Sequence, residues 1–283
     1  MGTETEVRWT PSGVRLRRVT RRPGRWNWLF VPGGPGLGSE SLLGLAETVQ
    51  VPGTAWLVDL PGDGSNRGVP QVPVHRYAAW PDVLAEAAGE LTDAVMVGHS
   101  TGGMFLLSVP GLAARLAGAV LVSSAPHAGW REAFGHWAAG HPLPGLAAAA
   151  DAYGRDPGDG TLRALTLAAA PWNFTPRGLP AGRALLAGLP YCHEAVAWAE
   201  TRFDEDYRAR WTPQEAGLPT LVVSGAEDHV VDQGLWRDAP GFHGPRVLHR
   251  TVPDAGHFPW IEAPAPVREA FAALVPLLRS GRP

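Results

Sequence analysis

The stretch VMVGHSTGGMF, residues 95–105, places a serine between glycines at the point where an apolar run ends. Residues 95–97 are typical of a buried strand, and the residues after Gly103 are apolar at helical spacing. Ser100 thus lies in the pattern Gly-x-Ser-x-Gly at a strand-to-helix turn. Such a turn strains the serine backbone, needs small neighbours on both sides and exposes the hydroxyl at a helix N-terminus. A plain turn is the alternative, but the context predicts that Ser100 is a nucleophile.

The composition is that of an ordinary globular chain. Of the 283 residues, 45% are hydrophobic and 18% are charged, and the formal net charge is -3. This charge provides no basic field for nucleic acid. Several arginines near the start alternate with apolar residues, and we interpret them as the solvated faces of opening strands. They are Arg8, Arg15, Arg17, Arg18, Arg21, Arg22 and Arg25.

The sequence shows no signal for export or for a membrane. Its opening residues lack a basic segment followed by an apolar one, and no apolar run reaches 18 residues. The single cysteine, Cys192, excludes an internal disulfide, and its context PYCHEAV does not match a nucleophilic cysteine. We therefore expect a cytoplasmic protein that binds neither membranes nor nucleic acid, and the oligomeric state stays open.

Short apolar runs alternate with helical patterns along most of the chain. Strands are predicted at 14–20, 26–31, 54–60, 93–98, 118–124, 220–225 and 246–252, and helices at 77–91, 101–116 and 265–278. Such alternation predicts an α/β fold, with a mostly parallel sheet that helices cover on both faces. Ligands of these sheets bind beyond the carboxyl ends of the strands.

One region breaks the alternation. Residues 127–215 contain no convincing strand, but they are rich in alanine, proline and tryptophan. We predict a helical lid over 127–215 that is inserted into a core of residues 1–126 and 216–283. The lid should lie over the carboxyl edge of the sheet, and its tryptophans are candidates for lining a substrate cavity. The candidates are Trp130, Trp137, Trp172 and Trp198.

A serine hydroxyl needs a base, and the base needs a carboxylate that orients it. His257 follows the last predicted strand, so it lies on the same edge as Ser100. Asp228 follows the strand before it and is preferred to Glu227. Asp232 is assigned to the following helix and Asp254 to capping its own loop. The resulting order along the chain is Ser, Asp, His, which is one of the known orders of a catalytic triad.

Acyl transfer also needs hydrogen-bond donors for the oxyanion. One is the backbone N–H of Thr101, the residue after the serine. The other is expected in the loop VPGGPGLG, where glycines let backbone N–H groups turn into a cavity, and we assign it to Gly34.

The chain resembles the α/β-hydrolase superfamily over nearly its whole length. The segments WNWLFVPGGPG, DLPGDGS, VGHSTGG, SGAEDHVV and AGHFPWIEAP follow one another in the order of that family's motifs. The resemblance implies an eight-stranded-type sheet, the triad Ser100, Asp228 and His257, and oxyanion donors at Gly34 and Thr101. The glycine-rich loop is similar to His-Gly-Gly-Pro-Gly of proline iminopeptidases, with Pro32 in place of the histidine.

These features predict a serine hydrolase that cleaves a small or medium hydrophobic ester, amide or lactone without a metal or cofactor. A proline iminopeptidase-like aminopeptidase is one alternative, since lid carboxylates could bind a substrate ammonium. We interpret those carboxylates, Glu200, Asp204, Glu205 and Asp206, as a solvated helix face. A biosynthetic lyase or cyclase that uses the triad for acid–base chemistry, and a non-catalytic receptor, are further alternatives.

Overall fold

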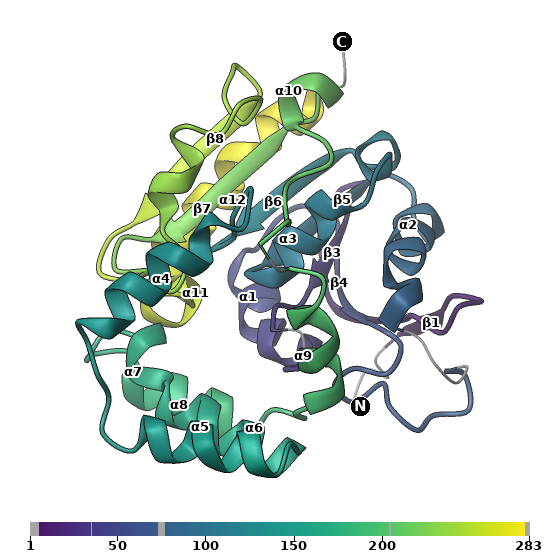
Figure 1. Ribbon diagram of the computed structural model, residues 1–283. Coiled ribbons are helices and arrows are strands. Elements are labelled where there is room, and N and C mark those ends of the chain that lie inside the picture. The colour runs from purple at the N-terminus through teal and green to yellow at the C-terminus, as the bar shows by residue number, and fades with distance from the viewer. Residues whose placement is uncertain (1–5, 35, 73–76, 204, 281–283) are drawn as a thin grey trace.

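An eight-stranded sheet runs through the protein (Figure 1). The computed structural model describes residues 6–34, 36–72, 77–203 and 205–280. Across the sheet the strands are β1 (Val7–Trp9), β2 (Arg15–Arg21), β4 (Thr54–Asp59), β3 (Asn27–Val31), β5 (Ala94–His99), β6 (Gly118–Val122), β7 (Thr220–Gly225) and β8 (Val247–Val252). β2 pairs antiparallel with β1 and β4, and the pairs from β4 to β8 are parallel. The predicted mostly parallel sheet is thereby confirmed.

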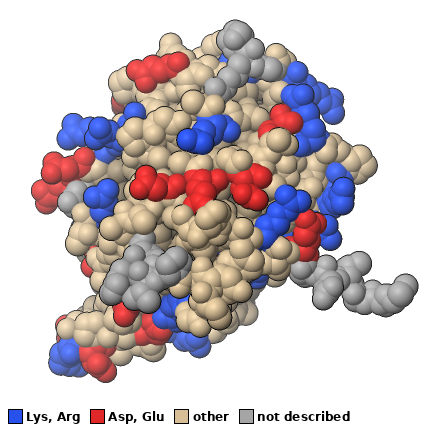
Figure 2. Space-filling model, turned by 90° about the vertical axis from the view of Figure 1, so that its right-hand side faces the viewer, with Lys and Arg blue, Asp and Glu red and all other residues tan. Residues whose placement is uncertain are grey.

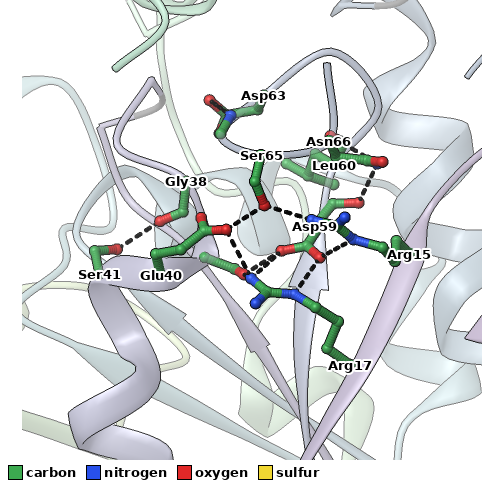
Figure 3. A network of polar contacts seen from close by, with 12 residues as sticks. Arg15, Arg17, Gly38, Glu40, Ser41, Asp59, Leu60, Asp63, Ser65 and Asn66 are labelled. Carbon is green, nitrogen blue, oxygen red and sulfur yellow. Dashed lines mark hydrogen bonds and ion pairs between the residues drawn. The ribbon is translucent and has the colours of Figure 1, made fainter. Parts of the chain in front are cut away.

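Seven of these strands coincide with predicted ones to within a few residues, whereas β1 was not predicted. β1 has only three residues, and it is exposed at the sheet edge, so it carries no hydrophobic alternation. The arginine interpretation was wrong for two residues of β2. Arg15 and Arg17 lie on one face of the strand and bind the buried carboxylate of Asp59 at the end of β4, with Nε to Oδ2 distances of 2.6 and 2.7 Å (Figure 3).

Helices cover both faces of the sheet, because the central strands are apolar on both sides. Val95 and Val97 of β5 belong to one hydrophobic core, and Met96 between them belongs to the other. α2 (Trp80–Glu90) and α3 (Thr101–Ser108) pack on the face of Met96, while α1 (Leu43–Thr48) and α12 (Pro264–Arg279) pack on the opposite face. The shorter elements are η1 (Ser39–Leu42), η2 (Tyr77–Ala79), η3 (Leu112–Arg115), α10 (Pro213–Ala216), η4 (Gln233–Trp236) and α11 (Pro259–Glu262).

The chain leaves β3 and β5 toward opposite faces of the sheet. These strands are neighbours, yet α1 follows β3 on one face and α3 follows β5 on the other. A crevice therefore opens between the loops at their carboxyl ends, and in open α/β sheets this is where ligands bind. Ser100 and the glycine-rich loop flank this position.

Helices make up most of the segment between β6 and β7. They are α4 (Gly129–Ala139), α5 (Leu146–Arg155), α6 (Asp159–Ala168), α7 (Ala170–Asn173), α8 (Leu179–Ala187) and α9 (His193–Glu200). The two ends of this helical insertion lie together, because Ala128 N–H donates to Tyr207 O and Ala209 N–H donates to Pro126 O. Its helices contact loops that follow β3, β4, β7 and β8, so the insertion lies along the carboxyl edge of the sheet (Figure 1).

One face of the molecule carries charges of both signs. In Figure 2 a row of acidic side chains crosses the middle of this face, and basic side chains lie above and beside it. In the described ranges, no helix combines the length and the apolar character needed to cross a bilayer.

Candidate active site

Ser100 lies at a sharp turn between β5 and α3, with φ of 51° and ψ of −125°. Non-glycine residues rarely adopt positive φ, so this backbone is strained and needs support from its surroundings. The glycines on either side permit close packing. A Cβ at Gly98 would lie 2.5 Å from the backbone of α3, and one at Gly102 would lie 2.5 Å from the carbonyl oxygens of Val31 and Pro32. The glycines of the motif are thus a steric requirement of the turn.

Asp228 and His257 are in contact, although they come from different loops. Both residues are buried, and His257 Nδ1 lies 3.1 Å from each carboxylate oxygen of Asp228. Asp228 Oδ1 also accepts hydrogen bonds from the N–H groups of Val230 and Val231, at 3.1 Å each. Since an ionised carboxylate only accepts, Nδ1 carries the ring hydrogen of a neutral His257. Its Nε2 then has a lone pair, which is the form that a general base needs.

The neighbouring acidic residues have other positions. The Glu227 side chain is 57% exposed. Asp232 Oδ1 accepts from Gly234 N–H at 2.7 Å and caps η4. Asp254 lies in the loop after β8, where its backbone has a φ of 52°. Of these acidic residues, only Asp228 binds His257.

His99, which precedes Ser100, is buried against the ring of His257. Its Nε2 lies 3.0 Å from the carbonyl oxygen of His257, and because a carbonyl only accepts, Nε2 carries the hydrogen. Burial and the neighbouring His257 ring hold the pKa of His99 well below its ordinary value, so His99 stays neutral. No hydrogen bond joins Ser100 Oγ to His257 in the described part of the chain. Such contacts often form only when substrate is bound.

The two expected oxyanion donors are adjacent. Thr101 Oγ1 lies 3.3 Å from Gly34 O, and a Cβ at Gly33 would lie 2.8 Å from Ser100 Cβ. Among the described residues, neither the Thr101 N–H nor the Gly34 N–H has an acceptor. Gly34 has φ of 108°, which a glycine adopts without strain.

The glycine-rich loop is held at Gly36 from two directions. Its carbonyl accepts from the N–H of Cys192, at the start of α9, at 2.8 Å. Its N–H donates to the buried carboxyl group of Asp63, in the loop after β4. Burial raises the pKa of Asp63 to about 7, while the N–H groups of Gly64 and Gly36 oppose this rise. Asp63 Oδ2 is buried and has no partner within the described residues.

A cavity of about 350 Å³ reaches the two candidate donors. Its walls are Gly34 and Thr101 together with residues of α4 and α9 and of the turn after α9, and these are Trp130, Arg131, Phe134, Val196, Ala199, Glu200 and Phe203. Glu200 and Arg131 are the two charged residues of this wall, which is otherwise mostly apolar. Glu200 is also exposed, in keeping with its interpretation as part of a solvated helix face. Asp204 lies outside the described residues.

The other candidate tryptophans lie elsewhere. Trp198 packs edge-on against Trp80, at 5.0 Å between ring centroids, and lines a small space beside Thr101. Trp137 and Trp172 line a separate cavity of about 570 Å³, which Glu227, His229 and Asp254 also border. This second cavity therefore adjoins the loops that carry Asp228 and His257.

Some functional candidates were missed from the sequence. Asn173 had no signal in the sequence, because its contact with the loop of His257 is made by its main-chain carbonyl, which accepts from His257 N–H at 2.8 Å. Asp63 could have been noticed as a carboxylate in a glycine-rich loop. Within the described ranges, no three His, Cys, Asp or Glu side chains are grouped so as to hold a metal ion.

Comparison with known proteins gives the class of this protein. The model of the alpha/beta hydrolase family matches residues 28–270. The chain therefore belongs to the α/β-hydrolase family, as its sequence motifs predicted.

Solved structures agree with this assignment. A proline iminopeptidase-related protein from Thermus thermophilus is 27% identical, with 97% of this chain and 100% of that chain covered and a TM-score of 0.68. A thermophilic esterase from Thermogutta terrifontis is 22% identical, with 98% of each chain covered and a TM-score of 0.66. An N-acyl homoserine lactone degrading enzyme is 22% identical, with 94% and 98% covered and a TM-score of 0.58. No curated protein matches the sequence.

Proposed function

We propose that this α/β-hydrolase is a serine hydrolase that cleaves a small or medium hydrophobic ester through an acyl-enzyme on Ser100. The observation that supports this most is the pair Asp228–His257, with Nδ1 at 3.1 Å from both carboxylate oxygens. The pair lies at the same sheet edge as a serine whose backbone has φ of 51°. A nucleophile, a base and a carboxylate that orients the base are the groups that acyl transfer requires.

In the proposed mechanism His257 Nε2 takes the proton of Ser100 as the hydroxyl attacks the substrate carbonyl. Gly34 and Thr101 donate backbone hydrogen bonds to the oxyanion, whose charge they stabilise more strongly than that of the ground-state carbonyl. His257 then protonates the leaving group and activates a water molecule for deacylation. Asp228 keeps the imidazole in the tautomer with Nδ1–H and stabilises the imidazolium.

The two cavities suggest where the parts of a substrate bind. Trp130, Phe134 and Trp137 are spaced i, i+4 and i+7, so they share one face of α4, which borders both cavities. We assign the acyl group to the 350 Å³ cavity, because it contains the oxyanion donors. The leaving group receives its proton from His257, so we assign it to the side of the 570 Å³ cavity. The insertion 127–215 then acts as the lid that shields the reaction from water.

Hydrolysis of p-nitrophenyl butyrate tests the proposal. We expect Ser100→Ala to abolish turnover and covalent labelling by a fluorophosphonate. Ser108→Ala, at the other end of α3, is the control and should keep both. Full esterase activity in Ser100→Ala would overturn the proposed function.

One observation favours a second candidate, an aminopeptidase. Glu200 lies in the wall of the cavity that holds Gly34 and Thr101, and a carboxylate in a mostly apolar wall suits a substrate ammonium. An aminopeptidase would cleave proline and alanine arylamides faster than their N-acetylated forms. Glu200→Gln would then raise KM for the free amine only. Equal rates on free and acetylated amines would exclude this candidate.

A further inference from the structure

The loop that carries His257 is hydrogen bonded along its backbone on both sides of the histidine. Gly256 N–H donates to Glu262 Oε2 at 2.7 Å, and His257 N–H donates to Asn173 O at 2.8 Å. The carbonyl of His257 accepts from His99 Nε2 at 3.0 Å. Of these partners His99 belongs to β5, Glu262 ends α11, and Asn173 belongs to the helical insertion.

Glu262 connects this loop to the insertion a second time. Its Oε1 accepts from the N–H of Thr175 at 2.9 Å and from the hydroxyl of Thr175 at 2.5 Å. The fit around the carboxylate is close, because a Cβ at Gly178 would lie 2.2 Å from Oε1. The guanidinium of Arg177 donates to the backbone carbonyl of Glu262 at 3.3 Å, which adds a further contact between the same two segments.

The donor pattern requires a carboxylate at this position. Two backbone N–H groups and one hydroxyl point at the two oxygens of Glu262. A carboxylate accepts at both oxygens, whereas an amide offers one acceptor and one NH₂ donor. In a glutamine the NH₂ group would face either Gly256 N–H or Thr175 N–H, so one of these two backbone donors would lose its partner.

We propose that Glu262 is a positioning residue for His257, and that it holds the catalytic base by tying residues 256–257 to residues 173–175 of the insertion. This inference rests on the proposed function, since it assigns to His257 the role of the base. It gives the insertion a part in the chemistry in addition to covering the site. Because misplacement of a catalytic group by about 1 Å can reduce the rate by about 100-fold, a small shift of this loop is enough to matter.

Glu262→Gln is the test, with Glu269→Gln as its matched control. Glu269 lies exposed on α12, and its side chain makes no hydrogen bond or ion pair among the described residues. On p-nitrophenyl acetate we expect Glu262→Gln to lower kcat by about 10- to 100-fold and to leave KM within about threefold. The rate of fluorophosphonate labelling of Ser100 should fall in parallel, because it reports activation of the serine without substrate binding. Glu269→Gln should change neither quantity.

A purely structural role would change other quantities. If Glu262 only holds the fold together, Glu262→Gln would lower Tm and the labelled fraction, while the labelling rate of the folded protein would stay that of the wild type. That result overturns the proposal. If Glu262→Gln does not fold, Thr175→Val replaces it as the test, since it removes the hydroxyl donor to Glu262 while Gly178 N–H, which also contacts that hydroxyl, keeps the carbonyl of Thr175 as an acceptor. We expect Thr175→Val to lower kcat about two- to fivefold at constant KM, and an unchanged kcat would overturn the proposal.

The two proposals fail in different ways. If Ser100→Ala abolishes activity while Glu262→Gln and Thr175→Val behave like Glu269→Gln, the positioning role is wrong and the hydrolase remains. If Ser100→Ala keeps its activity, the proposed function is wrong, and the role of Glu262 is wrong with it.

Discussion

The proposed nucleophile and the proposed base are held in different ways. Ser100 is fixed by close backbone packing around Gly98 and Gly102, that is, by residues of its own turn and of the adjacent strand end. His257 is fixed by hydrogen bonds to Asp228, His99 and Asn173, which lie far from it in the sequence. The position of Ser100 therefore depends on close backbone packing, whereas that of His257 depends on hydrogen bonds across the assembled fold, including the insertion.

The largest effect on kcat should come from a change at Asp228, the partner of His257. In Asp228→Asn the amide oxygen can keep the hydrogen bonds from Val230 and Val231, so the NH₂ group faces His257 Nδ1. The ring hydrogen then moves to Nε2, which can no longer accept a proton. We expect kcat to fall about 10⁴-fold, measured on p-nitrophenyl butyrate. Asp232→Asn, which affects only the cap of η4, is the control and should keep nearly full activity. If Asp228→Asn keeps more than about a tenth of the wild-type kcat, the assignment of Asp228 is wrong.

Asp63 tests whether the glycine-rich loop is held by a protonated carboxyl group. Burial raises its pKa from 3.8 to about 7 in the folded protein, so from about pH 4 to pH 7 the folded state binds a proton that the unfolded state has lost. Stability from this group is therefore present at low pH and lost as the pH rises through 7.

Asp63→Asn cannot ionise and escapes this loss. The free energy of unfolding of the variant, minus that of the wild type, should be larger at pH 8.5 than at pH 4.5. The increase has an upper limit of about 4 kcal/mol. Urea denaturation at both pH values measures it. Any cost of burying the amide group is the same at both, so the difference isolates the carboxyl group. A stability difference that does not vary with pH would show that Asp63 is ionised in the folded protein.

Gly102 tests the local sterics of the nucleophile. In Gly102→Ala the new Cβ would lie 2.5 Å from two backbone carbonyl oxygens, so β3 and α3 must move apart. We expect a loss of about 2–3 kcal/mol of stability together with a fall in kcat. Gly135→Ala on α4, where nothing lies within 4 Å, is the control and should be neutral or stabilising by thermal melting. Equal melting temperatures for both variants would contradict the packing argument.

The smallest effect concerns the two cavities. Trp130→Ala enlarges the cavity that contains Thr101, so the preference for butyrate over acetate esters should change about tenfold. Trp172→Ala alters the other cavity and should instead change the preference between p-nitrophenyl and methyl leaving groups. Measured kcat/KM values for matched esters separate the two effects. The subsite assignment fails if both variants change the same preference.

The sequence predicted the parts of the molecule that local patterns encode. The parallel strands follow from apolar runs, and the turn at Ser100 follows from the spacing of two glycines. Asp228 and His257 could be chosen because strand ends meet at one edge. The roles of Glu262 and Asn173 could not, because a hydrogen bond to a distant backbone group leaves no pattern in the sequence around it. The same reason explains the misinterpretation of Arg15 and Arg17, whose partner Asp59 lies on another strand.

The order of the strands also has a consequence for biosynthesis. Ser100 and the strands β3, β5 and β6 around it precede the insertion, whereas β7 and β8 are added at one edge of the sheet. At about 5–20 residues per second, His257 is synthesised roughly 8–30 s after Ser100. A nascent chain thus carries the proposed nucleophile without its base. Under the proposed function, Ser100 gains its base only after β8 has been synthesised and has joined the sheet.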